Sequence, residues 1–327
     1  MAISREMSGE AAASRSKALA FIREIEKVVI GKHNETVLLL SAMFGGGHVL
    51  IEDVPGVGKT TLAAAVAKAA GLKFRRAQFT PDVTASDITG YNIYNRSAER
   101  FEFREGLVMS NVFLADEINR ASPKTQSALL EAMEEGRVTV DGVTYDIPTP
   151  FMVIATQNPQ GYVGTYPLPE AQLDRFAVRI SLGYPTEDEE LSIILERKKS
   201  NPLDSVEAVV TGEDIAMIKN AVTEVEMASE ISRYAVALVA ATRKSPLVSL
   251  GASPRASLAL MRVSKAFAFL SGRDYVTPED VAAVYKPVTA HRITPSQDAR
   301  FERLSNEDVL DRVMREVEVP YFRKNYR

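Results

Sequence analysis

Cysteine is absent from the 327-residue sequence. Disulfide bonds, thiolate metal sites and cysteine nucleophiles are therefore excluded. Histidine is scarce as well: the three copies, His33, His48 and His291, lie far apart in the chain, so a histidine zinc site is not expected. A strong charge of one sign is also missing, because 39 lysines and arginines against 43 acids leave a formal net charge of −4. This balance disfavours a strongly cationic surface for nucleic acid.

Long hydrophobic runs are missing too. A membrane-spanning helix needs about 20 predominantly apolar residues, and the most apolar region, residues 36–51, is interrupted by three glycines at 45–47. The first 17 residues contain Glu6 and Glu10 and have no apolar centre of the kind found in a secretory signal. We therefore expect no membrane insertion and a cytoplasmic location.

Hydrophobic periodicity divides the chain into two parts. Residues 18–44 are predicted to form two helices, and from residue 48 to about 182 short apolar β-type runs alternate with helices. Such alternation predicts a parallel sheet covered by helices on both faces. Beyond that region only helical periodicity remains. The prediction is an α/β core over residues 1–185, followed by a smaller all-helical domain over residues 186–327.

Two insertions in the first part are predicted to be β-hairpins. The first has its turn within residues 94–103 and interrupts a helix. The second covers residues 138–147, where Asp-Gly lies between two alternating strands.

A phosphate-binding loop follows the first predicted strand. Residues 53–61 read DVPGVGKTT and stand between a strand and a helix, where backbone N–H groups face an anion. Lys59 is expected to reach the β- and γ-phosphates, and the Thr60 hydroxyl to ligate Mg²⁺. Asp53 occupies the place where the general pattern begins with glycine. The predicted nucleotide-binding residues of the loop are Pro55, Gly56, Val57, Gly58, Lys59, Thr60 and Thr61.

Two later strands end in polar side chains that complete such a site. One strand ends in Asp116 and Glu117. Asp116 is predicted to bind the nucleotide complex by holding Mg²⁺ through water. Glu117 is predicted to orient and deprotonate the attacking water. The next strand leads to Asn158, whose amide can polarise that water. The second acid distinguishes hydrolases from kinases, and the sequence has no Asn-Lys-x-Asp guanine signature. ATP is therefore the predicted nucleotide.

Four stretches together resemble the MoxR family of AAA+ ATPases. They are residues 52–60 (EDVPGVGKT), 114–121 (LADEINRA), 155–159 (ATQNP) and 168–176 (LPEAQLDRF). The resemblance extends from about residue 28 to about residue 292, and Asp53 looks usual for this family. It implies an AAA+ P-loop core followed by a helical lid.

The resemblance also implies roles that the residue pattern alone does not assign. Ile30 and Gly31 look like part of the segment that packs on adenine. Arg175 looks like an arginine finger that reaches the ATP of a neighbouring subunit, with Arg120 as a second candidate for that interface. Arg255 looks like the second sensor, which reports the γ-phosphate to the lid. These roles imply a homo-oligomeric ring, with six subunits by analogy.

For the function, the resemblance implies a chaperone-like remodeller or maturation factor that acts with proteins carrying von Willebrand A domains. Three alternatives stay open: a magnesium-chelatase-like ATPase subunit, an MCM-like nucleic-acid motor and a non-hydrolysing scaffold. The hairpin at 138–147 offers Asp141 and Asp146 but no basic residue, whereas a nucleic-acid motor presents lysine or arginine to phosphates. We therefore expect a protein partner and no nucleic acid.

Overall fold

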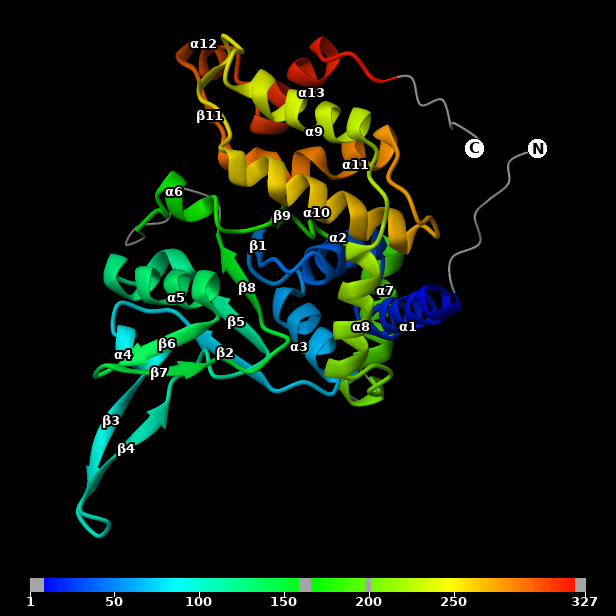
Figure 1. The fold of residues 1–327 in the computed structure, drawn as a ribbon. Coiled ribbons are helices and arrows are strands. Elements are labelled where there is room, and N and C mark those ends of the chain that lie inside the picture. Colours follow the sequence, from blue (N-terminus) through cyan, green and yellow to red (C-terminus); the bar gives the residue numbers. More distant parts are fainter. Residues whose placement is uncertain (1–8, 159–165, 198–200, 321–327) are drawn as a thin grey trace.

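The computed structural model describes residues 9–158, 166–197 and 201–320, with a five-stranded sheet at its centre (Figure 1). The strand order is β2-β5-β8-β1-β9, and every neighbouring pair is parallel. The strands are β1 (Val49–Glu52), β2 (Phe74–Gln78), β5 (Val112–Asp116), β8 (Met152–Gln157) and β9 (Val178–Ile180). This confirms the parallel sheet predicted from the alternating pattern.

Alternate residues of the central strands face two separate apolar cores. In β5, Val112 and Leu114 belong to one core, and Phe113 and Ala115 belong to the other. Because both faces are covered, the central strands are continuous apolar runs. One face is covered by α1 (Gly9–Glu26), α2 (His33–Phe44) and α3 (Lys59–Ala69), and the other by α4 (Ala85–Thr89) and α5 (Pro123–Glu135).

Local sequence signals fix the bounds of α5. The Ser122 side chain caps the helix by accepting a hydrogen bond from the backbone N–H of Thr125 at 3.3 Å, and Pro123 takes the first helical position. Gly136 ends the helix with φ of +65°, a left-handed conformation that glycine adopts readily.

Both predicted hairpins are present. The first is β3 (Gly90–Asn95) with β4 (Arg100–Glu105), and the second is β6 (Arg137–Val140) with β7 (Val143–Asp146). The β3–β4 hairpin projects from the body of the molecule (Figure 1). The two hairpins contact each other, since the rings of Phe103 and Tyr145 stack with centroids 3.8 Å apart.

The second part of the chain is helical, as predicted, apart from one short strand pair. Its β10 (Val248–Leu250) and β11 (Thr294–Pro295) pair antiparallel, and strands this short show no periodicity from which they could be predicted. The helices of this part are α7 (Glu187–Arg197), α8 (Gly212–Thr223), α9 (Ser229–Thr242), α10 (Pro254–Leu270), α11 (Pro278–Thr289), α12 (Gln297–Phe301) and α13 (Asn306–Glu316). It also contains the short helical elements η2 (Pro202–Ser205) and η3 (Ala290–Arg292). The corresponding short elements of the first part are η1 (Ile118–Arg120) and α6 (Glu170–Leu173).

The proposed division at residue 185 lies between β9 and α7. One apolar core nevertheless continues from α1 and α2 into α8, α9, α10 and α11. Movement of the second part would therefore have to preserve, or exchange, apolar contacts with the two N-terminal helices. Among the described residues, no helix combines the length and the apolar character needed to cross a membrane.

Candidate active site

The loop between β1 and α3 opens onto a cavity of about 380 Å³. Gly56 and Gly58 have φ of +90° and +97°, and a Cβ at either position would meet no atom within 4 Å. The backbone there is left-handed and exposed to the cavity, as close approach of a phosphate requires. This cavity, called the loop cavity below, is lined by Pro55, Gly56, Gly58, Lys59, Thr60, Thr61, Arg76, Gln78, Asp116, Glu117 and Asn158.

Lys59 lies at the centre of the polar contacts in the loop cavity. Its Nζ donates to the backbone oxygen of Asp53 at 2.7 Å and to Oδ1 of Asn158 at 3.4 Å. Burial lowers the pKa of this amine, and the negative charges of Asp53, Asp116 and Glu117 oppose that effect. The ammonium group is thus held among acids, in reach of an incoming anion.

Asp116 and Glu117 are held by a hydroxyl that the sequence analysis does not identify. The Thr156 Oγ1 donates to Oδ1 of Asp116 at 2.6 Å and accepts from the backbone N–H of Glu117 at 2.9 Å. Thr156 is fully buried in β8, so it fixes both acids from the neighbouring strand. A polar residue inside an otherwise apolar strand is the sequence signal that could have found it.

Glu117 has a left-handed backbone, with φ of +56° and ψ of +47°. For a residue other than glycine this conformation costs about 1–3 kcal/mol and is concentrated at functional sites. Its Oε2 accepts from Arg120 at 2.9 Å, and its Oε1 lies 3.5 Å from Nδ2 of Asn158. Arg120, considered in the sequence for a subunit interface, therefore forms an ion pair with Glu117 in the isolated chain.

Asp53 connects the loop to the segment that leads into the second part of the chain. Its Oδ2 accepts from Ser181 Oγ at 3.0 Å and from the backbone N–H of Gly183 at 2.7 Å, and its Oδ1 accepts from Val54 N–H at 2.8 Å. A glycine at this position would lack all three contacts. The departure from the general loop pattern thus has a structural reason.

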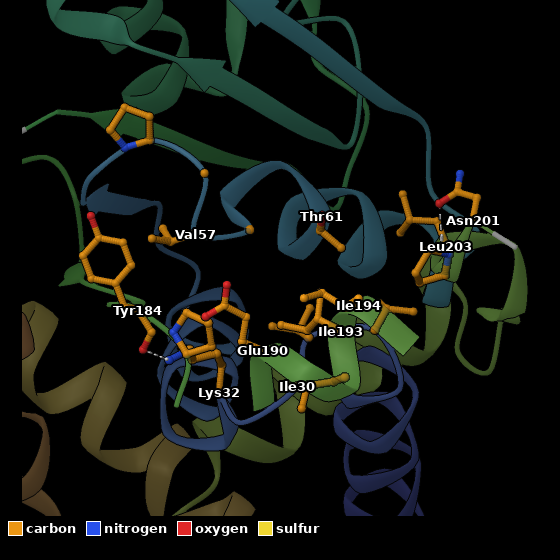
Figure 2. A pocket seen from close by; sticks show the side chains of 17 residues that line it. Ile30, Lys32, Val57, Thr61, Tyr184, Glu190, Ile193, Ile194, Asn201 and Leu203 are labelled. Carbon is orange, nitrogen blue, oxygen red and sulfur yellow. Dashed lines mark hydrogen bonds between the residues drawn. The ribbon is translucent and has the colours of Figure 1, made fainter. Parts of the chain in front are cut away.

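A second, larger cavity of about 730 Å³ adjoins the loop (Figure 2). It shares Pro55, Gly56, Gly58 and Thr61 with the loop cavity. Figure 2 shows Ile193 and Ile194 of α7 across from Thr61 of α3. Its other apolar lining residues include Val28, Val29, Ile30, Val57 and Leu203. Its size and mostly apolar lining suit a ring-shaped ligand group, and it is called the apolar cavity below.

Of the two residues predicted to pack on adenine, only Ile30 lines the apolar cavity. Gly31 instead has φ of +73°, and a Cβ there would lie 1.8 Å from Oε1 of Glu189. Gly31 therefore permits the turn between α1 and α2 and the close approach of α7.

Arg175 and Arg255 lie together, and neither lines the loop cavity or the apolar cavity among the described residues. Both pair with one carboxylate: Nη2 of Arg175 is 3.2 Å from Oε2 of Glu134, and Nη2 of Arg255 is 2.5 Å from Oε1. These three residues are called the arginine patch. The structure therefore does not bring Arg255 to the loop of its own chain. The cap of α10 explains this, since Ser253 Oγ donates to Asp174 at 2.7 Å.

A buried ion pair between Arg292 and Asp174 lies next to the arginine patch. Arg292, with 2% of its side chain exposed, donates from Nε to Oδ1 of Asp174 at 2.9 Å and from Nη2 to the backbone oxygen of Phe176 at 2.7 Å. Burial lowers the pKa of Arg292 to about 10, against the opposing effect of Asp174, so the guanidinium stays charged at neutral pH. Asp174 directly precedes Arg175 and also holds the start of α10.

Replacing Arg292 by alanine should lower the free energy of unfolding by about 3–5 kcal/mol, because a buried carboxylate loses its partner. Urea denaturation at neutral pH measures the change. Arg312→Ala is the matched control: it removes an exposed pair with Glu302 and should cost about 0–1 kcal/mol. Equal losses in the two variants would contradict a stabilising role for the buried pair.

Comparison with known proteins identifies the family. Residues 48–178 match the model of the ATPase family associated with various cellular activities (AAA), and residues 240–313 match the AAA lid domain. The chain is 41% identical to Chaperone MoxR1 of Mycobacterium tuberculosis over 308 residues, which cover 91% of this chain and 81% of that protein. The chain belongs to the MoxR family of AAA+ ATPases.

The chain also has a relative of similar length and a solved structure of similar fold. It is 48% identical to the uncharacterised protein YeaC of Bacillus subtilis, over 94% of this chain and 96% of that one. The crystal structure of a proposed ATPase from Cytophaga hutchinsonii superimposes with a TM-score of 0.88 at 39% identity, over 95% of this chain and 97% of that chain. The MoxR chain is thus a nucleotide-binding ATPase with an AAA core and a lid.

Proposed function

We propose that the chain is one subunit of an ATP-hydrolysing ring in which the arginine patch of each subunit completes the nucleotide site of its neighbour. One observation carries this proposal: Arg175 and Arg255 lie apart from the loop cavity of their own chain and share Glu134 at a partly exposed position. A head-to-tail interface generates a closed ring when its rotation closes. Six subunits are proposed by family analogy.

In this proposal, ATP places its base in the apolar cavity and its phosphates in the loop cavity. Lys59 and the backbone N–H groups of residues 56–60 bind the phosphates. Glu117 accepts a proton from the attacking water, and Asn158 orients that water from the adjacent strand end. Arg175 and Arg255 of the neighbour stabilise the charge that develops on the transferred phosphoryl group.

Mg²⁺ fits the residues of the loop cavity. Thr60 offers a hydroxyl and Asp116 a carboxylate, the hard oxygen donors that this ion prefers. Within the described ranges, no group of three His, Cys, Asp or Glu residues forms a cage of protein ligands. Mg²⁺ is typically bound through one or two carboxylates together with substrate phosphates. Bound there, it would neutralise charge on the β- and γ-phosphates.

The proposed work of the ring is remodelling or maturation of a protein client, with a von Willebrand A domain protein as the proposed partner. The relative in Mycobacterium tuberculosis carries the name chaperone. The β3–β4 hairpin supports a protein client, since Tyr94 and Phe101 are exposed by 49% and 70% and pack edge to face. Arg100 on the same hairpin pairs with Glu102, which disfavours a phosphate-binding role.

Hydrolysis that needs a neighbour must depend on assembly. ATP turnover per subunit should therefore rise with protein concentration in parallel with the assembled fraction, measured as oligomer mass in the same samples. The neighbour supplies groups that contribute up to about 10³–10⁵ in rate in related phosphoryl transfers. Constant turnover per subunit on dilution to the monomer would overturn the shared site.

A magnesium-chelatase-like subunit and a non-hydrolysing scaffold make different predictions for the same samples. A chelatase-like subunit would hydrolyse ATP in the ring but would pair with chelatase subunits, so the purified partner distinguishes it. A scaffold would assemble and bind ATP without turnover in any state of assembly.

A further inference from the structure

Arg76 is a cation in the loop cavity that the proposed mechanism does not use. It lies on β2, the edge strand next to β5, and its Nη2 is 2.7 Å from Oδ2 of Asp116. The side chain of Arg76 is 44% exposed, whereas that of Asp116 is 12% exposed. Arg76 therefore reaches from the rim of the cavity to a largely buried acid.

The preceding arginine on the same strand has a different environment. Arg75 donates to the backbone oxygen of Gly106 and pairs with Glu105 at 3.1 Å, and it does not line the loop cavity. Successive side chains of a strand point to opposite faces. The strand thus directs one arginine of the pair into the loop cavity and the other away from it.

Both oxygens of Asp116 already have donors. Oδ1 accepts from the Thr156 hydroxyl at 2.6 Å, and Oδ2 accepts from Arg76 at 2.7 Å. The Thr156 contact is buried inside the sheet, whereas the Arg76 contact lies at the cavity. A metal that uses Asp116, directly or through water, therefore shares this carboxylate with the guanidinium of Arg76, and the two cations compete for its charge.

We propose that Arg76 neutralises Asp116 before the metal arrives, and that binding of Mg²⁺ with ATP transfers its guanidinium from Asp116 to the γ-phosphate. The released group stays in the cavity that holds Lys59 and Thr60. Its planar fork of N–H donors matches phosphate oxygens well. The inference rests on the proposed Mg²⁺ site at Asp116.

The transfer of Arg76 from Asp116 to the γ-phosphate has opposite effects on metal binding and on nucleotide binding. While Arg76 holds Asp116, it weakens metal binding, because the two cations compete for one carboxylate. Once the metal is bound, Arg76 strengthens binding of a nucleotide that carries a γ-phosphate. If Arg76 had a purely structural role, replacing it would not strengthen Mg²⁺ binding while weakening the binding of a nucleotide that carries a γ-phosphate.

The test is Arg76→Gln, with Arg75→Gln as the matched control and Arg76→Lys as the charge-retaining variant. The probes are the fluorescent, non-hydrolysable analogue mant-AMPPNP and mant-ADP, titrated with and without Mg²⁺. In Arg76→Gln the Mg²⁺ concentration for half-maximal effect on mant-ADP, which has no γ-phosphate to accept the released guanidinium, should fall about threefold to tenfold, the size expected for a partly exposed ion pair. The preference for mant-AMPPNP over mant-ADP should fall by about tenfold.

Arg76→Lys should restore most of the metal competition and only part of the preference, because lysine keeps the charge but not the planar fork. Arg75→Gln should match the wild type in both measurements. An Arg76→Gln variant whose Mg²⁺ requirement is unchanged or raised, or whose preference for mant-AMPPNP is unchanged, overturns the exchange. A wild-type protein whose mant-AMPPNP affinity ignores Mg²⁺ instead overturns the proposed metal site itself.

Discussion

Glu117→Gln should lower ATP turnover by about 10²–10⁴-fold, the usual contribution of a general base. The amide keeps the shape of the side chain but cannot take a proton from water. The backbone N–H of Glu117, which donates to Thr156, is unchanged by the substitution, whereas the ion pair with Arg120 is lost. Binding of ATP, measured with a fluorescent analogue, should stay within a few-fold of the wild type because Lys59 and the loop are intact.

The matched control for this prediction is Glu135→Gln at the end of α5. Glu135 is exposed and pairs with Arg137 at 3.1 Å, so it resembles Glu117 in having an arginine partner. It lies outside the loop cavity, and its loss should leave turnover unchanged. If Glu117→Gln binds ATP normally and keeps more than about a tenth of the wild-type turnover, Glu117 is not the base.

The polar ends of the strands could be foreseen from sequence because local rules determine them. A glycine-containing loop between a strand and a helix, and acids that follow an apolar strand, have a fixed place in a parallel sheet. The structure brings Lys59, Asp116, Glu117 and Asn158 to one cavity. Their catalytic roles stay predictions until the variants are measured.

The strand β2 could not be foreseen, and Arg76 was missed with it. Its residues 74–78 read FRRAQ, and only Ala77 is buried. An edge strand has one neighbour in the sheet, so it needs no continuous apolar run. Arg76 reaches Asp116 only because β2 pairs with β5, and the two residues are 40 positions apart in the chain.

The position of Arg255 likewise depends on a contact that no local pattern contains. Ser253 and Pro254 correctly indicate the start of a helix. They do not indicate which part of the molecule that start will contact. The hydrogen bond from Ser253 to Asp174, 79 positions away, places the helix start beside Arg175. A role for Arg255 at the site of a neighbour is therefore a proposal from the structure.

Arg175→Ala should lower turnover in the assembled protein by about 10³–10⁵-fold, the contribution of an arginine finger in phosphoryl transfer. ATP binding to the isolated subunit should be unchanged, because Arg175 lines neither the loop cavity nor the apolar cavity in the described part of the chain. Oligomer mass is measured alongside, since lost assembly would also lower turnover. The control is Arg137→Ala, which replaces an exposed arginine near Arg175 and should leave ATP turnover unchanged.

Mixing two inactive variants separates a shared site from a site within one chain. A subunit with Arg175→Ala keeps its own Glu117, and a neighbouring subunit with Glu117→Gln keeps its Arg175. Random mixing in a head-to-tail ring should restore about a quarter of the wild-type turnover, since about a quarter of interfaces then combine both intact residues. If mixed rings form and no turnover returns, Arg175 does not act across the interface, and Arg120 becomes the next residue to replace.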